Sequence, residues 1–537
     1  MSDMTVTISD ETPSAGGPRV LTGRRRIVSS APVITVDNVR EQFELAMATH
    51  AANFSDINYL HEYFLGRQPV LGRVKEVRPE IKNTVVENRA YQICKDRADS
   101  LAGEPITFSA HVAKDKGRPD DEDEASKASD ELSHRIQRLN DVCEMSDKHA
   151  VDMEIVQWMC EVGVGYRLVM PSTGIAGECD TPIMMASLDP RRTFVVYSND
   201  MFRRPLYAAT YVTREDTSER VVTLYTAESV FQFADSGEVH VSPNPMGRVP
   251  IIEYDANSER MGVFEAVLSL LDAINEVESN RVDGIAQFVQ ALLVLENVDF
   301  EDDDAETGFK KLMKMGCLQI HSTEDNKASV TMLTSELNQD QTQTLVDALY
   351  KTALSICGMP FNVGGSASTS DTGAAVTMRD GWSNHESRCK ETEIHFKRGE
   401  REFLAIACYL LEASEHLGLR PVDVEIKFTR RNYEAIQSKA QVLTMLLGCG
   451  KVHPRLAFEY CGMFPDPETA YDLSKAYAAE AMAGQMQLLK AKTAALGGSD
   501  TRADGPNGVG GDVTAASKGT QPPSTKRSEG KDEQNEA

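Results

Sequence analysis

The chain contains no run of about 18 apolar residues, so its sequence predicts no membrane-spanning helix. Residues 1–17 are polar and lack the basic start and apolar centre of a signal peptide. Ten cysteines are scattered without a Cys-x-x-Cys pair, which argues against zinc ribbons and thioredoxin-like sites. We therefore expect free thiols in a reducing cytoplasm and no contact with a membrane.

The motifs of several enzyme classes are also missing. The nearest approach to a phosphate-binding loop, Gly448–Lys451, lacks the first glycine and the final hydroxyl residue. Neither the H-E-x-x-H motif of metalloproteases nor the G-x-S-x-G turn of serine hydrolases occurs. The sequence therefore predicts a protein without catalysis, cofactor or metal.

One segment keeps an enzymatic alternative open. Asp423, Glu425 and Lys427 resemble the E-x-K strand of metal-dependent nucleases, in which carboxylates hold Mg²⁺ and the lysine orients the attacking water. The apolar residues within 422–428 alternate with these charges, as in any strand with one solvated face. We favour the ordinary strand, and an assay for metal-dependent cleavage of plasmid DNA separates the two hypotheses.

Positive charge is scarce, because 56 Lys and Arg face 82 Asp and Glu and leave a net charge of −26. This sign is unfavourable for gripping nucleic acid through its phosphates, and solubility alone is a sufficient reason for it. The one basic cluster, Arg24–Arg26, lies in the polar segment 1–38. We expect that segment to be a flexible leader and the cluster to be solvated.

Helical spacing of apolar residues predicts the first part of the fold. The helices expected there are Val39–Leu65, Thr84–Ala102 and Ser126–Gly163, the last with an optional break near Asp141. The acidic run Asp120–Glu124 predicts a loop, because five adjacent like charges repel one another.

Between residues 164 and 255 the pattern changes to short β-branched and aromatic runs separated by Gly, Pro, Asn and Asp. It predicts a β-rich module between helical ones. The expected strands are Tyr166–Met170, Pro182–Ser187, Phe194–Tyr197, Leu206–Val212, Arg220–Tyr225, Ser229–Phe233 and Ile251–Tyr254.

The strongest helical pattern covers Gly262–Leu295, which as one helix would extend about 50 Å. That is too long to lie across a single small domain. A second helix is expected at Asp340–Cys357 and ends at Gly358 and Pro360. The apolar face of the first helix includes Leu270, Leu271, Ile274, Val277, Ile285, Phe288 and Leu292.

Two segments separate these two helices: the acidic loop Asp299–Glu306, which ends the first helix, and a compact segment that follows it. That segment carries a short expected helix at Gly308–Lys314 and expected strands near Cys317–His321 and Ser329–Leu333.

After Pro360, the segment Asn362–Gly373 reads NVGGSASTSDTG. Its glycines allow backbone conformations closed to other residues, and its side chains are small or polar, so an ordinary flexible linker also fits. Its residues include Asn362, Gly364, Gly365, Ser366, Ser368, Thr369, Ser370, Asp371 and Gly373.

Another long helix is expected over Ala374–Leu417, with Trp382, Cys389, Phe396, Phe403 and Leu410 standing seven apart. This stripe faces a neighbouring element, but the positions four residues further on include Glu386, Glu393 and Glu400, so the helix is not a full coiled coil. A strand at Pro421–Phe428 and about three helices through Lys492 complete the ordered part. Residues from Gly497 onward lack apolar periodicity, and we expect them to be disordered.

The order of several segments resembles the portal proteins of tailed phages, in the branch found in many long-tailed phages. The resemblance covers about Val39–Lys492. It lies in "YFLGR" at 63–67, "LAGEPITF" at 101–108, "GRVPIIEYDAN" at 247–257, "LLDAINEVESNRVDGIAQFVQALLVLEN" at 270–297 and "ICGMPFNVGGSASTSDTGAAVTM" at 356–378.

This resemblance implies an α+β, mainly helical subunit with wing, stem, clip and crown regions. It places the wing at 39–260, with a helical part at 39–163 and a β-rich part at 164–260. The chain returns to the wing at 376–432 with a long helix and a strand. The stem helices are 261–296 and 340–358, and the apolar face of the first helix packs against neighbouring subunits in the ring. The remaining regions are the clip at 297–339, a tunnel loop at 359–375 lining the channel, and the crown at 433–496, with a leader at 1–38 and a tail at 497–537 outside the pattern.

The resemblance also implies the partners. They are further copies of the chain, twelve in a ring, double-stranded DNA in the channel, the terminase large subunit, a head-to-tail adaptor, and the major capsid and scaffolding proteins. The ring sits at a capsid vertex of the virion and forms in the host cytoplasm. A negatively charged lumen would repel phosphates and let DNA slide.

Two alternatives remain at this stage. One is a capsid-associated nuclease using the strand at 423–427, and the other is a minor capsid or scaffolding protein without a channel. Negative-stain images of the purified protein separate the second alternative from a ring.

Overall fold

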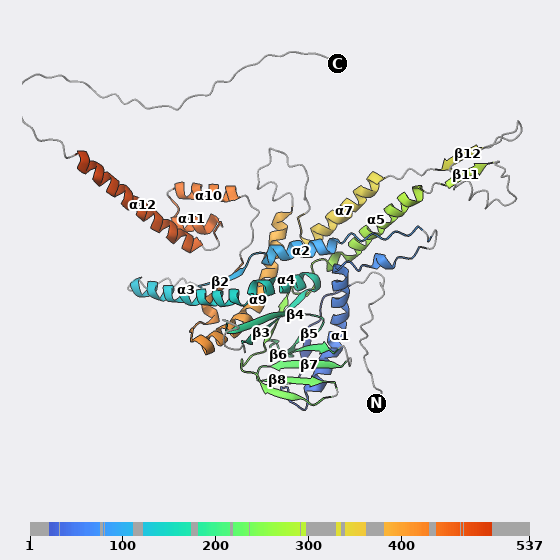
Figure 1. Cartoon of the computed structure of the whole chain (residues 1–537), viewed down its shortest axis with the longest axis horizontal. Coiled ribbons are helices and arrows are strands. Elements are labelled where there is room, and N and C mark those ends of the chain that lie inside the picture. Colours follow the sequence, from blue (N-terminus) through green and yellow to red (C-terminus); the bar gives the residue numbers. More distant parts are fainter. Residues whose placement is uncertain are drawn as a thin grey trace, which may run out of the picture. The chain divides into compact units, whose positions relative to one another are not determined.

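The computed structural model has 55% helix and 19% strand, which confirms a mixed α+β fold that is mainly helical (Figure 1). The chain divides into two compact units, Met1–Val442 and Leu443–Ala537, which are described separately below. The structure describes residues 21–31, 33–75, 79, 81–110, 122–172, 181–214, 219–235, 237–289, 292–296, 329–333, 339–360, 381–428, 436–449, 451–461, 463–464 and 467–496.

The three helices predicted for the first part of this unit are present as four, because the third is divided in two. The expected break near Asp141 falls six residues later, where Asp147 adopts a left-handed φ of 52° between two helices. The acidic run is only partly a loop, because its last three residues begin a helix, where carboxylates are favoured by the helix dipole. The helices are α1 (Val39–Phe64), α2 (Arg89–Ala102), α3 (Glu122–Met145) and α4 (Lys148–Val162).

All seven strands expected between residues 164 and 255 are present, and they divide between two sheets. A three-stranded sheet has the order β10-β3-β4, and a six-stranded sheet has the order β1-β5-β6-β7-β8-β9. Strands β1 and β9 were not expected. The strands are β1 (Ile27–Ser29), β3 (Val164–Pro171), β4 (Ile183–Leu188), β5 (Thr193–Ser198), β6 (Pro205–Thr213), β7 (Arg220–Thr226), β8 (Ser229–Ala234), β9 (His240–Pro243) and β10 (Ile251–Asp255).

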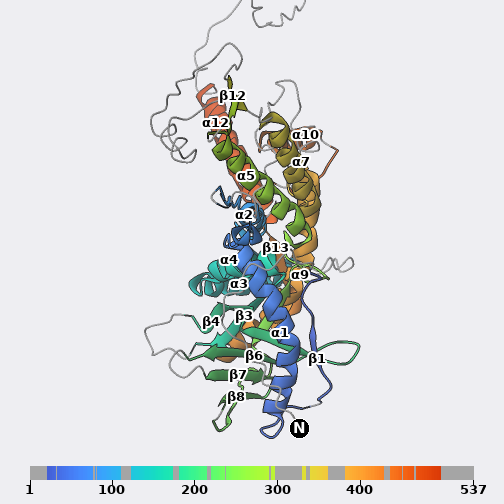
Figure 2. The ribbon, with the colours of Figure 1, turned by 90° about the vertical axis from the view of Figure 1, so that its right-hand side faces the viewer.

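Helix α1 covers one face of the six-stranded sheet (Figure 2). Phe43 of α1 packs in one apolar cluster with Phe194 and Val196 of β5. The alternate residues Val195 and Tyr197 belong to the larger core on the other side. Because successive side chains of a strand point to opposite faces, β5 separates the α1 side of the sheet from the α9 side.

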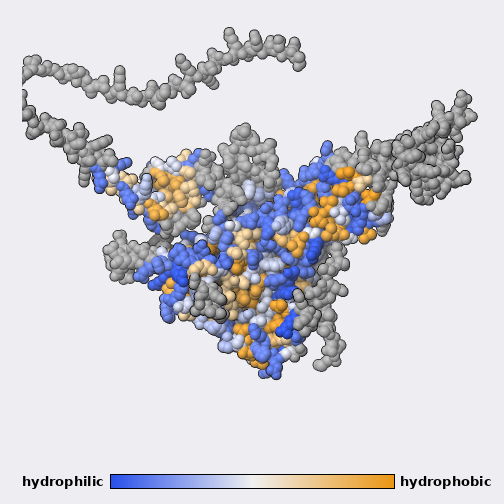
Figure 3. All heavy atoms as spheres, in the orientation of Figure 1, coloured by the Kyte–Doolittle hydropathy of each residue, from blue (hydrophilic) through white to orange (hydrophobic). Residues whose placement is uncertain are grey.

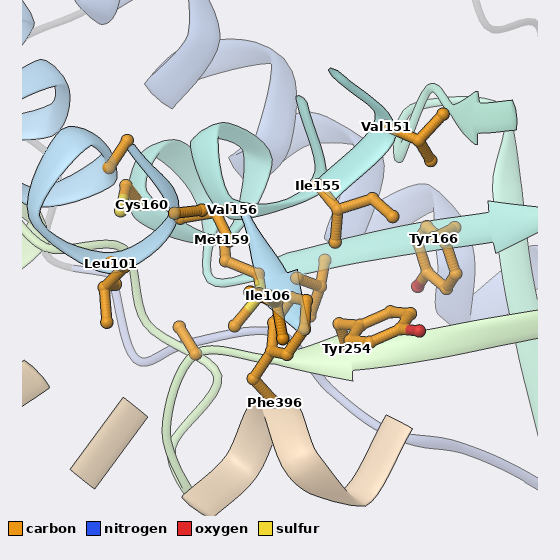
Figure 4. Packing of buried hydrophobic residues seen from close by; sticks show 14 of the residues in the cluster. Leu101, Ile106, Val151, Ile155, Val156, Met159, Cys160, Tyr166, Tyr254 and Phe396 are labelled. Carbon is orange, nitrogen blue, oxygen red and sulfur yellow. The ribbon is translucent and has the colours of Figure 1, made fainter. Parts of the chain in front are cut away.

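The long helix α9 (Trp382–Glu415) is buried in this larger core. The predicted seven-residue stripe faces inward, and Phe396 and Phe403 are almost completely buried. Figure 4 shows Phe396 beside Tyr254 of β10, under side chains of α4. Gly399 allows this close approach, since a Cβ at this position would lie 2.6 Å from the Tyr254 ring.

One charged position of α9 also faces the core. Glu400 accepts a hydrogen bond of 2.6 Å from Arg167 and one of 3.1 Å from Tyr254, and Lys148 lies 3.4 Å away. Lys148 and Arg167 both pair with Asp152 as well. Burial raises the pKa of Glu400, but the two cations outweigh it and hold that pKa below its ordinary value. Two cations and two carboxylates thus neutralise one another away from water.

The prediction of a flexible leader through residue 38 with a solvated arginine cluster is wrong for the described residues from 21 onward. Strand β1 pairs in parallel with β5, and Arg24 is buried 2.7 Å from Glu265. Arg26 lies 2.6 Å from Asp255. The arginines find their carboxylates more than 200 residues away along the chain. A local pattern cannot reveal such partners, and for this reason the cluster was misread as a solvated tail.

One short strand pairing and three C-terminal helices lie outside these two sheets. Strand β2 (Ile106–Ala110) pairs antiparallel with β13 (Val424–Phe428), which follows a 3-10 turn at Pro421–Asp423. The three expected C-terminal helices are present, and the first of them crosses the division between the two units. Within the second unit Phe458 stacks on Phe464 and contacts Tyr471. The helices are α10 (Ile436–Gly448), α11 (Pro454–Cys461) and α12 (Pro467–Leu496).

Candidate functional site

Helices α5 (Leu268–Val289) and α7 (Gln339–Cys357) lie side by side in the first unit (Figures 1 and 2). Arg281 of α5 donates a hydrogen bond of 2.7 Å to Gln343 of α7. Beyond the helices, β11 (Leu292–Glu296) and β12 (Ser329–Leu333) form an antiparallel pair. The two helices and the two strands together make one projecting arm of the chain.

The helix predicted over 262–295 is shorter than expected. A 3-10 turn at Glu265–Val267 leads into α5, which ends at Val289. Leu292, assigned to the apolar face of this helix, lies instead in β11 opposite Leu333. A short apolar run is compatible with either helix or strand, and the partner at residues 329–333 decides in favour of strand.

The other residues predicted for this face divide into two groups. Leu271 and Ile274 are buried, and Leu270 and Val277 are partly buried against the same core. Ile285 is 49% exposed, as are Leu345 and Ile356 of α7. The side chain of Phe288 lies outside the described residues. Figure 3 shows apolar surface gathered over the region of α5 and α7.

A polar ladder on α5 was not foreseen. Asn275, Ser279 and Asp283 stand four residues apart on the helix, and all three are buried. They accept hydrogen bonds of 2.8, 3.0 and 2.7 Å from the backbone amides of Glu87, Val85 and Asn83, in that order. The ladder therefore holds residues 83–87 in an extended conformation along α5. Two residues of this segment correspond to about one turn of the helix.

This ladder corrects the helix predicted over Thr84–Ala102. The backbone amides at 83, 85 and 87 bind side chains of α5, so they are not available for helix formation. Helix α2 begins at Arg89, after Asn88 accepts a hydrogen bond from the amide of Tyr91 as an N-cap.

Asp283 is the most strongly stabilised carboxylate of the arm. Burial acts to raise its pKa, but the Asn83 amide, Lys75 and the Asn83 side chain outweigh burial and lower the pKa to about 2. Lys75 and Arg73 both lie 3.0 Å from the carboxylate. Asp283 is therefore ionised at neutral pH, and its carboxylate joins α5 to the segment that contains Arg73, Lys75 and Asn83.

A second junction lies where α7 ends and α9 begins. The buried Arg97 of α2 donates to the carbonyls of Cys357 and Gly358, at 2.7 and 3.2 Å. His385 of α9 also contacts the Gly358 carbonyl, at 3.3 Å. Gly358 has a φ of +65°, which allows α7 to stop there. The two helices flanking residues 361–380 are thus tied to α2 at one point.

Several predicted positions lie outside the described residues. They include most of the predicted clip, 297–328 and 334–338, the disordered tail from 497, and the segment 361–380. That last segment contains every residue predicted to line the channel, from Asn362 to Gly373.

The strand considered as a nuclease site does not form a metal centre. Asp423 is bound by Arg420 at 2.9 Å, and Glu425 is exposed on β13. Among the described residues, no group of three His, Cys, Asp or Glu side chains is arranged to hold a metal ion. Eight cysteines lie in the described ranges, and all eight are free thiols. No described helix combines the length and apolar character needed to span a bilayer.

Comparison with known proteins identifies the family of this chain. A relative, the portal protein of Bacillus phage SPP1, is 26% identical over 298 residues, which cover 50% of this chain and 52% of that protein. The chain thus matches about half the length of this curated relative. The family model "Phage portal protein, SPP1 Gp6-like" matches residues 46–485. That range spans most of the chain, from within α1 to within α12, and so the chain belongs to the SPP1 Gp6-like family of phage portal proteins.

Proposed function

We propose that the protein forms a ring at one capsid vertex and that double-stranded DNA passes through this ring during packaging and ejection. Portal proteins are structural rather than enzymatic, which agrees with the absence of catalytic motifs and sets the nuclease alternative aside. Membership of the family implies an oligomeric ring and DNA passage. Twelve subunits in the ring, and the contacts with other proteins, belong to the proposal.

The observation that carries the proposal is the arm formed by α5 and α7. Its base is buried in the subunit core, whereas Ile285 and Leu345 remain about half exposed further along, and Ile356 is half exposed near the base. Exposed apolar side chains on two adjacent helices favour contact with another protein surface. In a closed ring each arm lies between two identical neighbours, which can cover these faces.

In this proposal the segments 261–296 and 340–358, which include α5 and α7, are the stem. The segment 297–339 is the clip, which docks the terminase large subunit during packaging and the head-to-tail adaptor afterwards. The wing is 39–260 with 376–432, and the crown is 433–496. The major capsid and scaffolding proteins are further partners in this proposal. Pull-downs test the docking: a clip deletion that still forms rings should lose both the terminase and the adaptor. Retention of both partners would contradict the assignment.

We also propose that residues 362–373 line the narrowest part of the channel. The described junction supports this, because Arg97 and His385 bring the helices on either side of the segment to one point. Small and hydroxyl side chains there can contact a passing duplex without reading its bases.

The test is Ser366→Arg with Ser368→Arg in all subunits, compared with Ser366→Ala with Ser368→Ala. Negative-stain imaging should show rings for both variants. DNA packaged per head should fall for the arginine variant alone, because cations bind phosphates. Normal packaging by the arginine variant would remove this segment from the constriction, and absence of rings in the wild-type protein and in assembled heads would overturn the ring itself.

A further inference from the structure

The turn between β5 and β6 presents two large apolar side chains to solvent. Met201 is 98% exposed and Phe202 is 77% exposed. Met201 is the most exposed large apolar side chain among the described residues. The next two residues are Arg203 and Arg204, both exposed. Aromatic residues and arginines are the types most enriched at the centres of protein interfaces.

This tip, defined as residues 199–204, is firmly built. The Asp200 carboxylate accepts hydrogen bonds from the amides of Phe202 and Arg203, at 2.9 and 2.7 Å. Ser198 accepts one from the Arg204 amide at 2.9 Å, and the Asn199 amide donates to β1. Arg203 is held at a φ of +47°, a conformation that few non-glycine residues adopt. A turn that is ordered before contact loses little entropy on binding.

The surroundings of the tip are basic. A hollow of about 190 Å³ beside it is lined by Phe202, Arg203 and Arg204 and by His395 and Arg398 of α9. The acids that line the hollow already face cations. Glu253 and Asp255 pair with Arg260 and Arg26. The exposed Glu402 lies 3.6 Å from Arg248. The outer rim therefore offers positive charge around an aromatic side chain, on a chain whose net charge is −26.

An acidic surface of matching character lies on the opposite side of the six-stranded sheet. Glu41, Leu45, Ala48 and Ala52 are all exposed on α1, at spacings of four, three and four residues, and form one stripe along the helix. Leu45 is 59% exposed, and the neighbouring Glu44 is exposed as well, with its carboxylate 3.2 Å from Arg220 of the same subunit. We call these five residues the α1 stripe. Its small residues leave room for large side chains from a partner.

The two surfaces lie on different faces of the six-stranded sheet within one subunit. Helix α1 packs on the Phe194 and Val196 face of β5, whereas Val195, Tyr197 and Phe202 line the hollow on the α9 side. Different, complementary patches on opposite sides of a subunit are what a head-to-tail ring needs. We propose that the tip of each subunit docks on the α1 stripe of the next copy, with Met201 and Phe202 beside Leu45, Ala48 and Ala52.

The inference rests on the proposed ring and assigns one of its contacts. In this contact Arg203 and Arg204 face Glu41 and Glu44 of the neighbouring copy. Charge complementarity of this kind fixes the register of an interface and disfavours wrong partners. Contact with a capsid or scaffolding protein is the competing use of the tip.

The experiment uses the full chain in a charge-swap design. Arg203→Glu with Arg204→Glu should lose rings at concentrations where the wild type forms them, by light scattering and negative stain, with an unchanged thermal midpoint. Glu41→Lys with Glu44→Lys should likewise lose rings at those concentrations. The combination of all four should restore rings, and Phe202→Ser should raise the concentration for half assembly at least tenfold.

Arg214→Glu with Lys390→Glu is the matched control, since both residues are exposed cations away from the tip. This control should assemble as the wild type does. Normal rings from the tip variant would overturn the contact while leaving the proposed function intact. Loss of rings in both pair variants without restoration in the combined protein would overturn the pairing of tip with α1 stripe. A wild type without rings would instead contradict the proposed function.

Discussion

Helix α9 and the α5–α7 arm belong to the same unit but are stabilised in different ways. Thirteen residues of α9 are buried, and one of its carboxylates, Glu400, is neutralised inside the core. The arm is held at its base by apolar contacts and by the ladder of Asn275, Ser279 and Asp283, yet apolar side chains along it stay half exposed. Helix α9 thus buries its apolar stripe within its own chain, whereas in the proposed ring neighbouring copies cover the exposed side chains of the arm.

The largest effect should come from the buried charges around α9. Arg167→Met leaves Asp152 and Glu400 with Lys148 as their remaining cation, and breaking a buried pair in this way destabilises a protein by about 3–5 kcal/mol. Chemical denaturation of the variant should show this loss. Arg135→Met, at a partly exposed position of α3, should change the free energy of unfolding by less than about 1 kcal/mol. Equal stability of the two variants would show that α9 is not held by these charges.

The ladder of the arm should contribute less and should depend on pH. Asp283→Asn removes charge-assisted hydrogen bonds and should destabilise the protein by about 2 kcal/mol at neutral pH. Because the pKa of Asp283 is lowered to about 2, the stabilisation is present above about pH 4 and is lost as the pH falls toward 2.

Denaturation curves of Asp283→Asn and wild type should therefore differ above pH 4 and converge toward pH 2. Asp347→Asn, at an exposed carboxylate of α7, is the control and should match the wild type throughout. A difference that stays constant from pH 7 to pH 2 would show that the ladder does not depend on the charge of Asp283.

The sequence predicted those parts of the fold that depend on local pattern. Seven strands and most helices follow from spacing alone, as does the inward stripe of α9 with Phe396 and Phe403. The errors have a common cause: the residues concerned contact partners that are far away along the chain. Arg24 was taken for a solvated residue because Glu265 is far along the chain, and Leu292 was placed in a helix because its strand partner Leu333 was not visible locally.

The candidate site was predicted in outline by the two long helices and by resemblance. The polar ladder was missed because polar residues on an apolar helix read as solvated positions. One signal could have revealed it: Asn275, Ser279 and Asp283 recur every four residues on the same helix. The junction at Arg97 had no comparable signal, since its partners are the backbone carbonyls of Cys357 and Gly358.

The exposed side chains of the arm should matter for assembly and hardly at all for the folded subunit. Ile285→Ser with Leu345→Ser should change the free energy of unfolding of dissociated subunits by less than about 0.5 kcal/mol. The same change should raise the concentration needed for ring formation, measured by light scattering. Leu271→Ser is the contrasting variant, because Leu271 is buried and its replacement should destabilise the subunit itself. Unaltered assembly by the double variant would mean that the arm is not a contact between subunits.

The smallest effect should follow removal of residues 497–537. Their sequence is rich in Gly, Ser, Thr and charge and poor in apolar residues, so it offers little surface for packing on the subunit or on a neighbour. A chain ending at Leu496 should keep the wild-type thermal midpoint and form rings at the same concentration. A chain ending at Phe464 is the control: it also loses α12, whose Tyr471 packs on Phe458, and should expose the apolar core of the second unit. Loss of rings from the chain ending at Leu496 would show that these 41 residues, 497–537, contribute to assembly despite their composition.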